Sequence, residues 1–315
     1  MTTRSRRPGT RTPAYPHTRS AQQYQTIRFD VAEHVATVTL NRPHVRNAQN
    51  SRLILELDDA MHRAADDPEV RVVVLAAAGP AFSAGHDLKA VVGQEAPDAW
   101  RRLRATPEGR LRHERELYLE KCLYIYNLPK PTIAQVQGPC VAAGMMLACM
   151  CDLIVAADDA QFSNPVLRMT GAGVELLVEP WELGQRKAKE FLFLGDPIDA
   201  REAWRLGLVN RVVPRRRLAS ATRALARRIA LLPPVTTALV KESINHAFDL
   251  MGKGHSFKYH FMLHQFMHGT RTAQQALAAR RRSGSIAGMV RERDQGIASS
   301  ARPRRVRRPR TRPRR

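Results

Sequence analysis

Short apolar segments that alternate with helix-like segments constrain the fold of this chain more than any other feature of its sequence. Three segments are mostly apolar, as is typical of strands buried on both faces: 70–76, 132–136 and 153–156. Residues 51–65, by contrast, carry apolar side chains at helical spacing, among them Leu53, Leu57 and Met61. Strands and helices that alternate in this way predict an α/β fold.

The two ends of the α/β region are expected to differ from its middle. Residues 24–29 and 34–40 are predicted to be paired strands, joined by a short polar turn at 30–33. After Pro214 the strand pattern ends. Three consecutive helices are predicted in its place, over 215–231, 235–249 and 256–282.

These changes of pattern divide the chain of 315 residues into four parts. The expected parts are a basic arm at 1–20, a core at 21–213, a helical region at 214–300 and an Arg-rich tail at 301–315. The arm and the tail combine many arginines with several prolines, which predicts disorder. Hydrophobic residues make up 43% of the chain, enough for a sizeable core, so disorder of the whole chain is excluded.

The formal net charge of +22 suggests a nucleic-acid-binding protein until it is divided along the chain. Residues 1–20 and 301–315 together hold +14, which leaves only +8 between them. The tail 301–315 has no aromatic side chains on which bases could stack, so specific nucleic-acid recognition is not expected. Non-specific phosphate binding by the tail stays an alternative.

Nothing in the sequence predicts a membrane segment or an oxidised compartment. The longest apolar run, 140–151, has 12 residues, well short of the roughly 20 that span a bilayer. Four cysteines in this length do not make a disulfide framework. We therefore expect a cytoplasmic protein. An organellar transit peptide at 1–20 is the alternative, which its three prolines disfavour.

Two segments rich in small residues carry the strongest indication of function. Residues 81–88 (AFSAGHDL) follow the first buried strand, and residues 137–146 (QGPCVAAGMM) follow the second. Each precedes an expected helix, so each places backbone N–H groups near a helix N-terminus, where negative charge is favoured. Two such donors that converge on one point would form an oxyanion hole. Taken separately, each segment is more often a packing feature.

The order and spacing of these segments and of several shorter motifs resemble the crotonase (enoyl-CoA hydratase/isomerase) superfamily. The further motifs, within about residues 24–250, are Asn41-Arg42-Pro43, Asn47-Ala48, Cys151-Asp152-Leu153, Ala160-Gln161-Phe162 and 207–213 (GLVNRVV). The resemblance implies a spiral of ββα turns and a thioester enolate held by two backbone N–H groups. It also implies an acyl-CoA substrate, with coenzyme A as part of the substrate and no other cofactor. A homotrimer or dimer of trimers is implied as well, with 214–300 serving oligomerisation and pocket closure.

The resemblance assigns the two N–H donors residue by residue. The first falls on His86, after Gly85, and the second on Ala143, before Gly144. The family usually has glycine at the second position, so Ala143 adds a Cβ but keeps the amide N–H. A backbone role is expected for His86, with a proton-shuttling imidazole as the alternative. Neighbouring residues expected to contact substrate are Ala84, Gly85, Asp87, Leu88 and Gly144.

The usual acid–base residues of the family are missing from this chain. A hydratase of the family uses two glutamates, and the matching positions hold Met146 and Val166, which transfer no protons. Both are still expected to line the substrate site. Glu175 lies at a third position that some relatives use, including certain isomerases and aryl-CoA dehalogenases. We expect it to be the general acid–base, with a pKa raised by burial. The alternatives are that Glu175 caps a helix or pairs with an arginine, and that Glu182 takes the role.

Basic residues and a histidine stripe complete the candidates. The residues expected near the phosphates of coenzyme A are Arg42, Arg46 and Lys89, although a solvated lysine is equally compatible with the third. His260, His264 and His268 lie four residues apart on one helical face, a spacing that suits a metal. No carboxylate or cysteine joins them in the sequence, so a packed or intersubunit surface and no metal are expected.

One carboxylate suits a proton shift better than a hydration, which normally uses two. The sequence therefore predicts an acyl-CoA-processing enzyme in which isomerase-like proton transfer by one carboxylate is favoured over hydration by two glutamates. The main alternative is a coenzyme-A-binding pseudoenzyme that has lost both glutamates. A nucleic-acid-binding protein that acts through 301–315 is a third, less favoured hypothesis.

Overall fold

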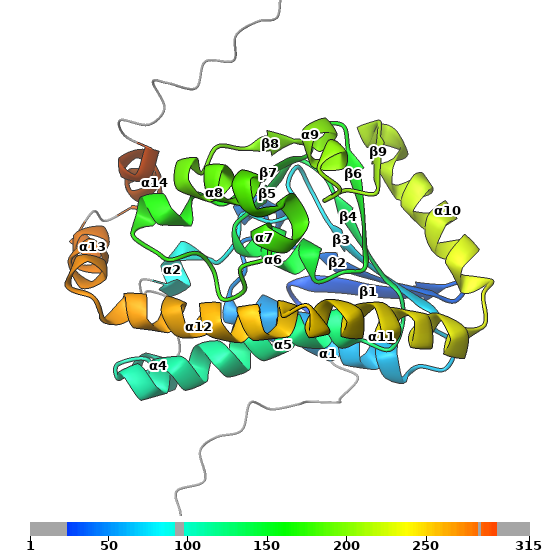
Figure 1. The fold of residues 1–315 in the computed structure, drawn as a ribbon, viewed down its shortest axis with the longest axis horizontal. Coiled ribbons are helices and arrows are strands. Elements are labelled where there is room, and N and C mark those ends of the chain that lie inside the picture. Colours follow the sequence, from blue (N-terminus) through cyan, green and yellow to red (C-terminus); the bar gives the residue numbers. More distant parts are fainter. Residues whose placement is uncertain (1–23, 92–97, 283–284, 295–315) are drawn as a thin grey trace, which may run out of the picture.

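A six-stranded sheet forms the frame of the molecule, and the computed structural model describes residues 24–91, 98–282 and 285–294 (Figure 1). In sheet order the strands are β1 (Ile27–Ala32), β2 (Val35–Leu40), β3 (Val72–Ala77), β4 (Thr132–Val136), β6 (Leu153–Ala157) and β9 (Arg211–Val213). The first pair is antiparallel and every later pair is parallel. The three buried strands expected from the sequence are β3, β4 and β6, which confirms the α/β class.

A second, three-stranded sheet consists of β5 (Pro139–Val141), β7 (Gln161–Ser163) and β8 (Ile198–Asp199). Strand β4 leads directly into β5, and β6 leads into β7, so successive turns of the chain add one strand to each sheet. Helix α6 (Ala143–Cys149) follows β5 and closes one such turn. This arrangement is the expected spiral of ββα turns.

Helix α1 (Ser51–Asp66) covers the inner face of the large sheet. It begins where the side-chain oxygen of Asn50 accepts a hydrogen bond from the backbone N–H of Leu53 at 3.0 Å. Leu53, Leu57 and Met61 are buried in the main core, which they share with residues of β2 and β3. The predicted helix at 51–65 is confirmed.

Helix α10 (Leu218–Ala230) covers the opposite face of the same sheet. Its apolar side chains pack in a separate cluster with residues of three parallel strands: Leu218, Leu225 and Ala226 with Val72, Ile133 and Val155. The expected boundary between 213 and 214 therefore separates the sheet from a helix that packs on it.

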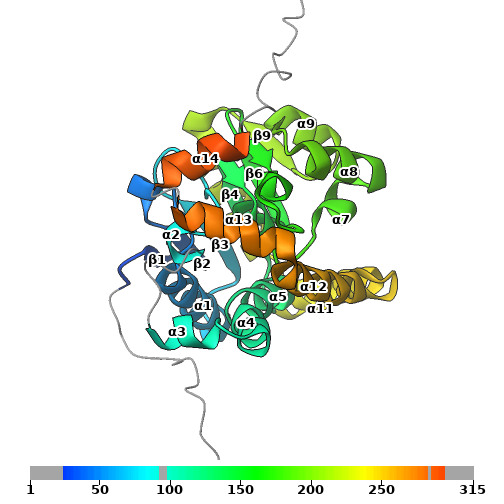
Figure 2. The ribbon, with the colours of Figure 1, turned by 90° about the vertical axis from the view of Figure 1, so that its left-hand side faces the viewer.

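A long helical stretch from 107 to 127 lies beside the C-terminal helices (Figures 1 and 2). It comprises α4 (Pro107–Glu114), a π-helical turn at Arg115–Leu119 and α5 (Glu120–Asn127). Helices α11 (Pro234–Leu250) and α12 (Lys253–Gly269) pack on each other, and α12 contacts α4. A π-helical turn inside an α-helix occurs frequently at functional sites.

The first hairpin turns later than the sequence predicts. Strand β1 continues through Ala32, which pairs with Val35, so the turn consists of Glu33 and His34. Both turn residues have positive φ, 52° and 62°, as the type I′ form of a two-residue hairpin turn requires. The expected turn at 30–33 is wrong because Asp30 belongs to the strand ladder.

The third predicted C-terminal helix, over 256–282, is two helices. Helix α12 ends at Gly269, and α13 (Arg271–Arg282) follows after a single extended residue, Thr270. The Thr270 hydroxyl accepts a hydrogen bond from the N–H of Ala273 at 3.3 Å and so caps the second helix. A short helix α14 (Ile286–Asp294) comes after it.

The remaining helices and the termini complete the description. The other α-helices are α2 (Leu88–Val91), α3 (Asp98–Leu103), α7 (Glu179–Leu183), α8 (Gln185–Leu194) and α9 (Ala200–Arg205). Four cysteines are buried and form no disulfide within the described residues. None of the helices in the described ranges is both long and apolar enough to cross a membrane. The expected tails at 1–20 and 301–315 lie outside the described residues.

Candidate active site

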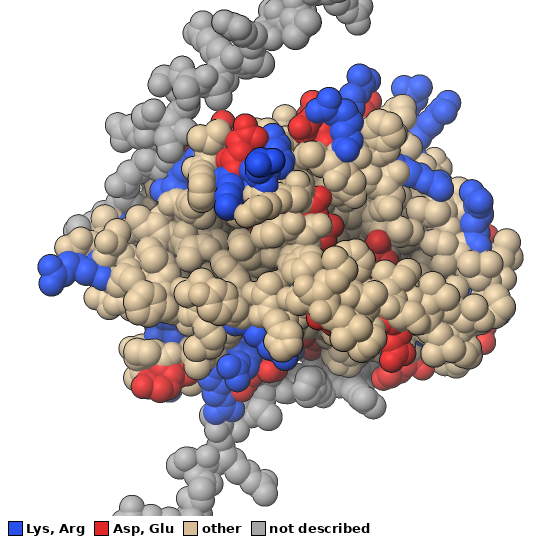
Figure 3. Space-filling view, viewed as in Figure 1, with Lys and Arg blue, Asp and Glu red and all other residues tan. Residues whose placement is uncertain are grey.

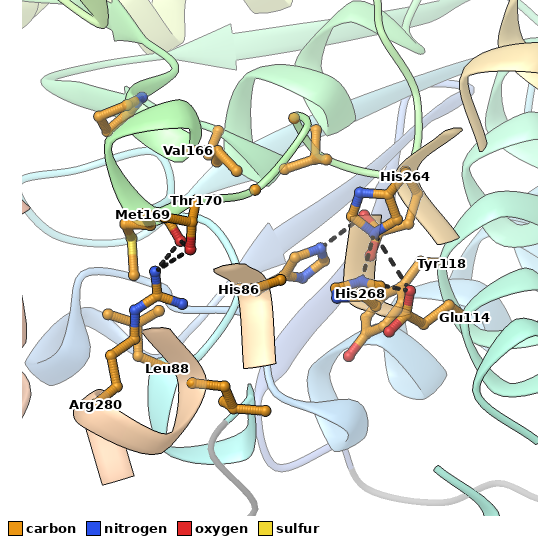
Figure 4. A pocket seen from close by; sticks show the side chains of 18 of the residues that line it. His86, Leu88, Glu114, Tyr118, Val166, Met169, Thr170, His264, His268 and Arg280 are labelled. Atoms are coloured by element: carbon orange, nitrogen blue, oxygen red, sulfur yellow. Dashed lines mark hydrogen bonds and ion pairs between the residues drawn. The ribbon is translucent and has the colours of Figure 1, made fainter. Parts of the chain in front are cut away.

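A cavity of about 200 Å³ lies between the small-residue segments and the C-terminal helices. Its walls come from parts of the chain that are far apart in sequence: residues 84–88, the helical stretch at 104–118, the loop at 165–175, and helices α12 and α13. Figure 4 shows side chains from all these parts converging on one space. The cavity is therefore created by tertiary packing around the two segments.

The two small-residue segments meet at the inner wall of this cavity. A Cβ placed on Gly85 would lie 2.8 Å from the carbonyl oxygen of Val141 and 3.4 Å from the backbone nitrogen of Ala143. Only glycine permits so close an approach of two backbones. His86, Val141 and Ala142 line the cavity, while Ala143 is fully buried next to Ala142.

The backbone N–H groups of His86 and Ala143 take no part in the hydrogen bonds that their neighbours form. The N–H of Gln49 donates to the Gly85 carbonyl, and the N–H of Asp87 donates to the Gln49 carbonyl, which leaves out the N–H of His86. Ala143 is the first residue of α6, so its N–H has no acceptor within that helix. Among the described residues, neither N–H donates a hydrogen bond.

Backbone strain and buried polar groups hold the second segment in place. Ala142 has φ 50° and ψ −112°, a conformation that is costly for a residue with a side chain, and its ψ sets the direction of the next N–H. The Gln49 side chain donates to the Ala143 carbonyl at 3.1 Å and to the Ser83 hydroxyl at 3.2 Å. The Ser83 hydroxyl in turn donates to the Asn47 carbonyl at 2.9 Å. Asn47 of the upstream motif thus braces the first segment, and the nearby Gln49 links it to the second.

Glu175 reaches the same cavity and pairs with the side chain of His86. Its Oε2 lies 2.9 Å from Nε2 of His86, whose ring points into the cavity in Figure 4. The His86 ring also contacts Tyr118, with ring centroids 4.4 Å apart. His260 donates from Nε2 to the Val174 carbonyl at 2.8 Å and so ties the Glu175 loop to α12. Within the described residues, Glu175 neither caps a helix nor pairs with an arginine.

The predicted direction of the Glu175 pKa shift is wrong. Burial favours the neutral carboxyl and would raise the pKa, but the charge and hydrogen bond of His86 outweigh burial and lower the pKa below its ordinary value of 4.5. The sequence showed that the residue would be buried but not that an imidazole would face it. Glu175 is consequently ionised at neutral pH, the state that a base requires.

Residues 30–282 match the family model described as enoyl-CoA hydratase/isomerase. The chain belongs to this family. The matched range includes both small-residue segments, the Glu175 loop and helix α12, which together form the cavity.

Named relatives and solved structures agree with this assignment. A Mycobacterium tuberculosis protein provisionally named enoyl-CoA hydratase EchA13 is 43% identical over 263 residues, which are 79% of this chain and 83% of the relative. A crystal structure of a probable enoyl-CoA hydratase from Mycobacterium smegmatis is 46% identical with a TM-score of 0.72, covering 78% of this chain and 94% of that one. An enoyl-CoA hydratase/isomerase from Xanthobacter autotrophicus Py2 is 32% identical with a TM-score of 0.76, covering 86% and 98%. The chain is thus an enzyme of the enoyl-CoA hydratase/isomerase family, with the crotonase fold.

The two positions that match the family's glutamates differ in their surroundings. Val166 lines the cavity together with Glu175. Met146 is only 1% exposed and lines a separate, smaller cavity of about 20 Å³ behind α6. The structure therefore brings Val166 to the site but not the Met146 side chain, and neither can carry a proton. Glu182, the lesser candidate, lies elsewhere and faces Lys253 at 3.4 Å.

The predicted substrate-binding residues around the first segment have different surroundings. Ala84 and Leu88 line the cavity, whereas Gly144 is buried against Ser83. The guanidinium of Arg42 lies 2.9 Å from the carboxylate of buried Asp87, so these two charges already neutralise each other. Arg46 and Lys89 are exposed and lie outside the lining of this cavity.

Sequence reasoning named His264 and His268 without placing them at the cavity, and it missed the other polar residues of the helical side. Besides His86 and Glu175, the polar lining of the cavity includes Arg104, Arg110, Glu114, Tyr118, His264, His268 and Arg280. Glu114 is the last residue of α4 and Tyr118 lies in the π-helical turn that follows, which leaves no recognisable pattern in the sequence. Arg280 of α13 donates to the Met169 carbonyl, which attaches that helix to the 165–175 loop (Figure 4).

The expectation that no carboxylate accompanies the histidine stripe is wrong. Oε2 of Glu114 lies 3.3 Å from Nε2 of His264 and 3.4 Å from Nε2 of His268. His260, the third histidine of the stripe, binds the Val174 carbonyl instead. The carboxylate comes from α4, distant in sequence, and only the packing of α4 on α12 brings it there.

Proposed function

We propose that the enzyme binds an acyl-CoA thioester with its carbonyl oxygen between the backbone N–H groups of His86 and Ala143. Both amides lack an acceptor among the described residues, and the two segments touch through their backbones at the cavity wall. Hydrogen-bond donors at this place stabilise the negative charge that develops when a thioester becomes an enolate. Coenzyme A enters this proposal only as part of the substrate, without another cofactor in the proton transfer.

Glu175 is the general base of the proposed reaction. Its carboxylate is ionised at neutral pH and buried in the cavity, where it accepts a proton from the carbon next to the thioester carbonyl. The protonated Glu175 exchanges with solvent and then delivers a proton to the carbon two positions further along the enolate, which shifts the double bond. The observation that carries this proposal is the Glu175–His86 contact of 2.9 Å beside the two segments.

Isomerase-like chemistry follows from Glu175 as the one carboxylate beside the two segments. The other carboxylate of the cavity, Glu114, is held on the helical side by His264, His268 and Gln265. Hydration by the usual route needs a second carboxylate to hold and deliver water, and the matching positions hold Met146 and Val166. Apolar side chains at the cavity, among them Leu88, Val166 and Met169, suit an acyl chain. Arg46 and Lys89, both exposed near the first segment, are proposed for the phosphates of coenzyme A.

Self-association into a homotrimer or a dimer of trimers is part of the proposal. Helices α11 and α12 and the turn before them expose large apolar side chains, among them Leu231 (82% exposed), Val235 (71%), Leu250 (76%) and Phe266 (74%). Figure 3 shows a mostly uncharged band along these helices, with charged side chains gathered above and below it. An apolar face of this kind is typical of a protein interface. The cytoplasmic location stays a prediction of the sequence.

The function is tested by incubating the protein with a panel of 2-enoyl- and 3-enoyl-CoA thioesters in deuterated water. The expected products are double-bond isomers that carry deuterium and no added oxygen, identified by mass and by double-bond position. A hydroxyacyl-CoA as the main product would contradict the one-carboxylate mechanism, because it requires addition of water.

A coenzyme-A-binding pseudoenzyme is the second candidate, favoured by the loss of both family glutamates at 146 and 166. In the same assay it would bind acyl-CoA thioesters, measured by calorimetry, with no isotope exchange and no product. Deuterium incorporation that the Glu175→Gln variant lacks would exclude it.

A further inference from the structure

We propose that Glu114, His264 and His268 form a binding site for a divalent transition-metal ion of the zinc class. The three residues come from two helices, α4 and α12, and all three line the cavity (Figure 4). Each offers one ligand atom, and these atoms lie within 4.8 Å of one another. The site is separate from the Glu175–His86 pair in its atoms and in its helices.

The distances among the three ligand atoms match those around a tetrahedral zinc ion. Glu114 Oε2 lies 3.3 Å from His264 Nε2 and 3.4 Å from His268 Nε2, and the two nitrogens are 3.2 Å apart. With zinc–ligand bonds of about 2.0–2.1 Å, tetrahedral angles separate neighbouring ligands by about 3.3–3.4 Å. An octahedral ion with bonds of about 2.1 Å would bring them to about 3.0 Å. The observed triangle fits one face of a tetrahedron.

Hydrogen bonds alone cannot satisfy all three contacts. An imidazole Nε2 carries at most one proton, and a carboxylate oxygen only accepts. If both nitrogens are protonated, both N–H groups donate to Glu114, and the contact between His264 and His268 then places two donors against each other, which is unfavourable. If one nitrogen is unprotonated, its lone pair faces the carboxylate oxygen. A cation inside the triangle accepts a lone pair from each atom and removes this conflict.

Burial and chemical type also favour a transition metal. Glu114 and His264 are 4% and 7% exposed, so the carboxylate is shielded from water and needs a positive partner. Two imidazoles with one carboxylate are ligands that suit zinc and its neighbours better than calcium or magnesium. The Gln265 side chain donates to the same Glu114 oxygen at 2.6 Å and so fixes its position, as outer-shell partners of metal ligands do.

Three protein ligands leave the fourth position of a tetrahedral ion open. Because all three ligands line the cavity, that position can hold water or an oxygen atom of a molecule bound in the cavity. The proposed metal is independent of the proposed proton transfer, in which it takes no part.

The experiment measures Co²⁺ binding by untagged protein that has first been treated with a chelator and dialysed. We expect one Co²⁺ per chain, the strong visible absorption of a tetrahedral rather than an octahedral ion, and displacement by Zn²⁺. Failure of the wild-type protein to bind one equivalent, or a weak octahedral spectrum, would overturn the proposal. The readout needs no turnover, so its failure leaves the acyl-CoA proposal standing.

Three variants assign the ion to this site. His268→Ala and Glu114→Gln should each weaken Co²⁺ binding by about 100-fold or more, and Gln265→Ala by about 10-fold. His268 has a side chain that is 30% exposed, so its truncation is the change least expected to disturb folding. His255→Ala, an exposed histidine on the same helix, is the control and should bind Co²⁺ like wild type. Equal binding by wild type and a folded His268→Ala would show that the ion sits elsewhere.

Discussion

The cavity contains two clusters of carboxylate and imidazole groups that differ in how they are held. Glu175 and His86 lie on loops next to the small-residue segments, whereas Glu114, His264 and His268 lie on packed helices. In both clusters, burial would raise the carboxylate pKa and the histidines lower it. One imidazole facing one carboxylate makes a satisfied hydrogen bond, while two imidazoles facing one carboxylate make a triangle that hydrogen bonds leave unsatisfied. The same residue types therefore suit proton transfer in one place and metal binding in the other.

Replacing Glu175 by glutamine should have the largest effect on turnover. The change keeps the side-chain shape but removes the base, so turnover should fall by about 100-fold to 10,000-fold with little change in acyl-CoA affinity. Steady-state kinetics and binding calorimetry check this. Glu69→Gln, an exposed glutamate distant from the cavity lining, is the matched control. Wild-type turnover in Glu175→Gln would show that Glu175 is not the general base. The loop cluster would then have no proposed catalytic function that separates it from the helical cluster.

Removing the Ala143 N–H tests the donor beside the loop cluster. Ala143→Pro eliminates the amide proton and should lower turnover by about 100-fold or more, because one of two oxyanion donors is lost. Ala143→Gly keeps the N–H and is the control, expected to remain active. Circular dichroism must show that the proline variant is folded. A folded Ala143→Pro with normal turnover would mean that the oxyanion is bound elsewhere.

Removing the His86 ring separates its side chain from its backbone. His86→Ala retains the N–H donor and loses the partner of Glu175, so we expect a smaller decrease in turnover, about 10-fold to 100-fold. The Glu175 pKa should rise, because only burial and the weaker influences of His264 and Glu114 remain. The acidic limb of the kcat/KM profile should accordingly move to higher pH than in wild type. An unchanged profile would show that His86 does not tune the base.

The smallest expected effect concerns stability in acid. The Glu175 pKa is lower in the folded than in the unfolded chain, so its contribution to stability is present above the ordinary value of 4.5 and is lost as pH falls below it. Urea unfolding at pH 7 and at pH 4 should show a larger loss for wild type than for Glu175→Gln. Equal losses would indicate that the charge of Glu175 adds nothing to the folded state.

The loop cluster was largely predictable, because its residues lie in recognisable local patterns. Gly85 and the small residues around Ala143 indicate close backbone contact, and Glu175 follows a glycine-rich loop. The sequence did not predict the partner of Glu175, and so it did not predict the direction in which the Glu175 pKa shifts. The His86 ring and the Glu175 carboxylate are 89 residues apart, and no local pattern says that they face each other.

The helical cluster was only half visible in the sequence. The spacing of His264 and His268 places them on one helical face, which is a local property of an α-helix. The position of Glu114 beside these histidines could not be predicted from the sequence. A π-helical turn directly follows it, and α4 meets α12 only in the folded protein. The break at Thr270 was missed for a related reason, since one capping hydroxyl divides a pattern that is helical on both sides.

The sequence by itself determined which segments become strands and helices, because apolar periodicity and capping act over a few residues. It also determined the fold family, since short motifs in a specific order encode it. Only the tertiary structure decided which charged side chains share the cavity, which carboxylate faces which imidazole, and in which direction the Glu175 pKa moves. Those outcomes depend on distances between residues that are remote in sequence, and electrostatic energy depends on distance and burial rather than on chain order.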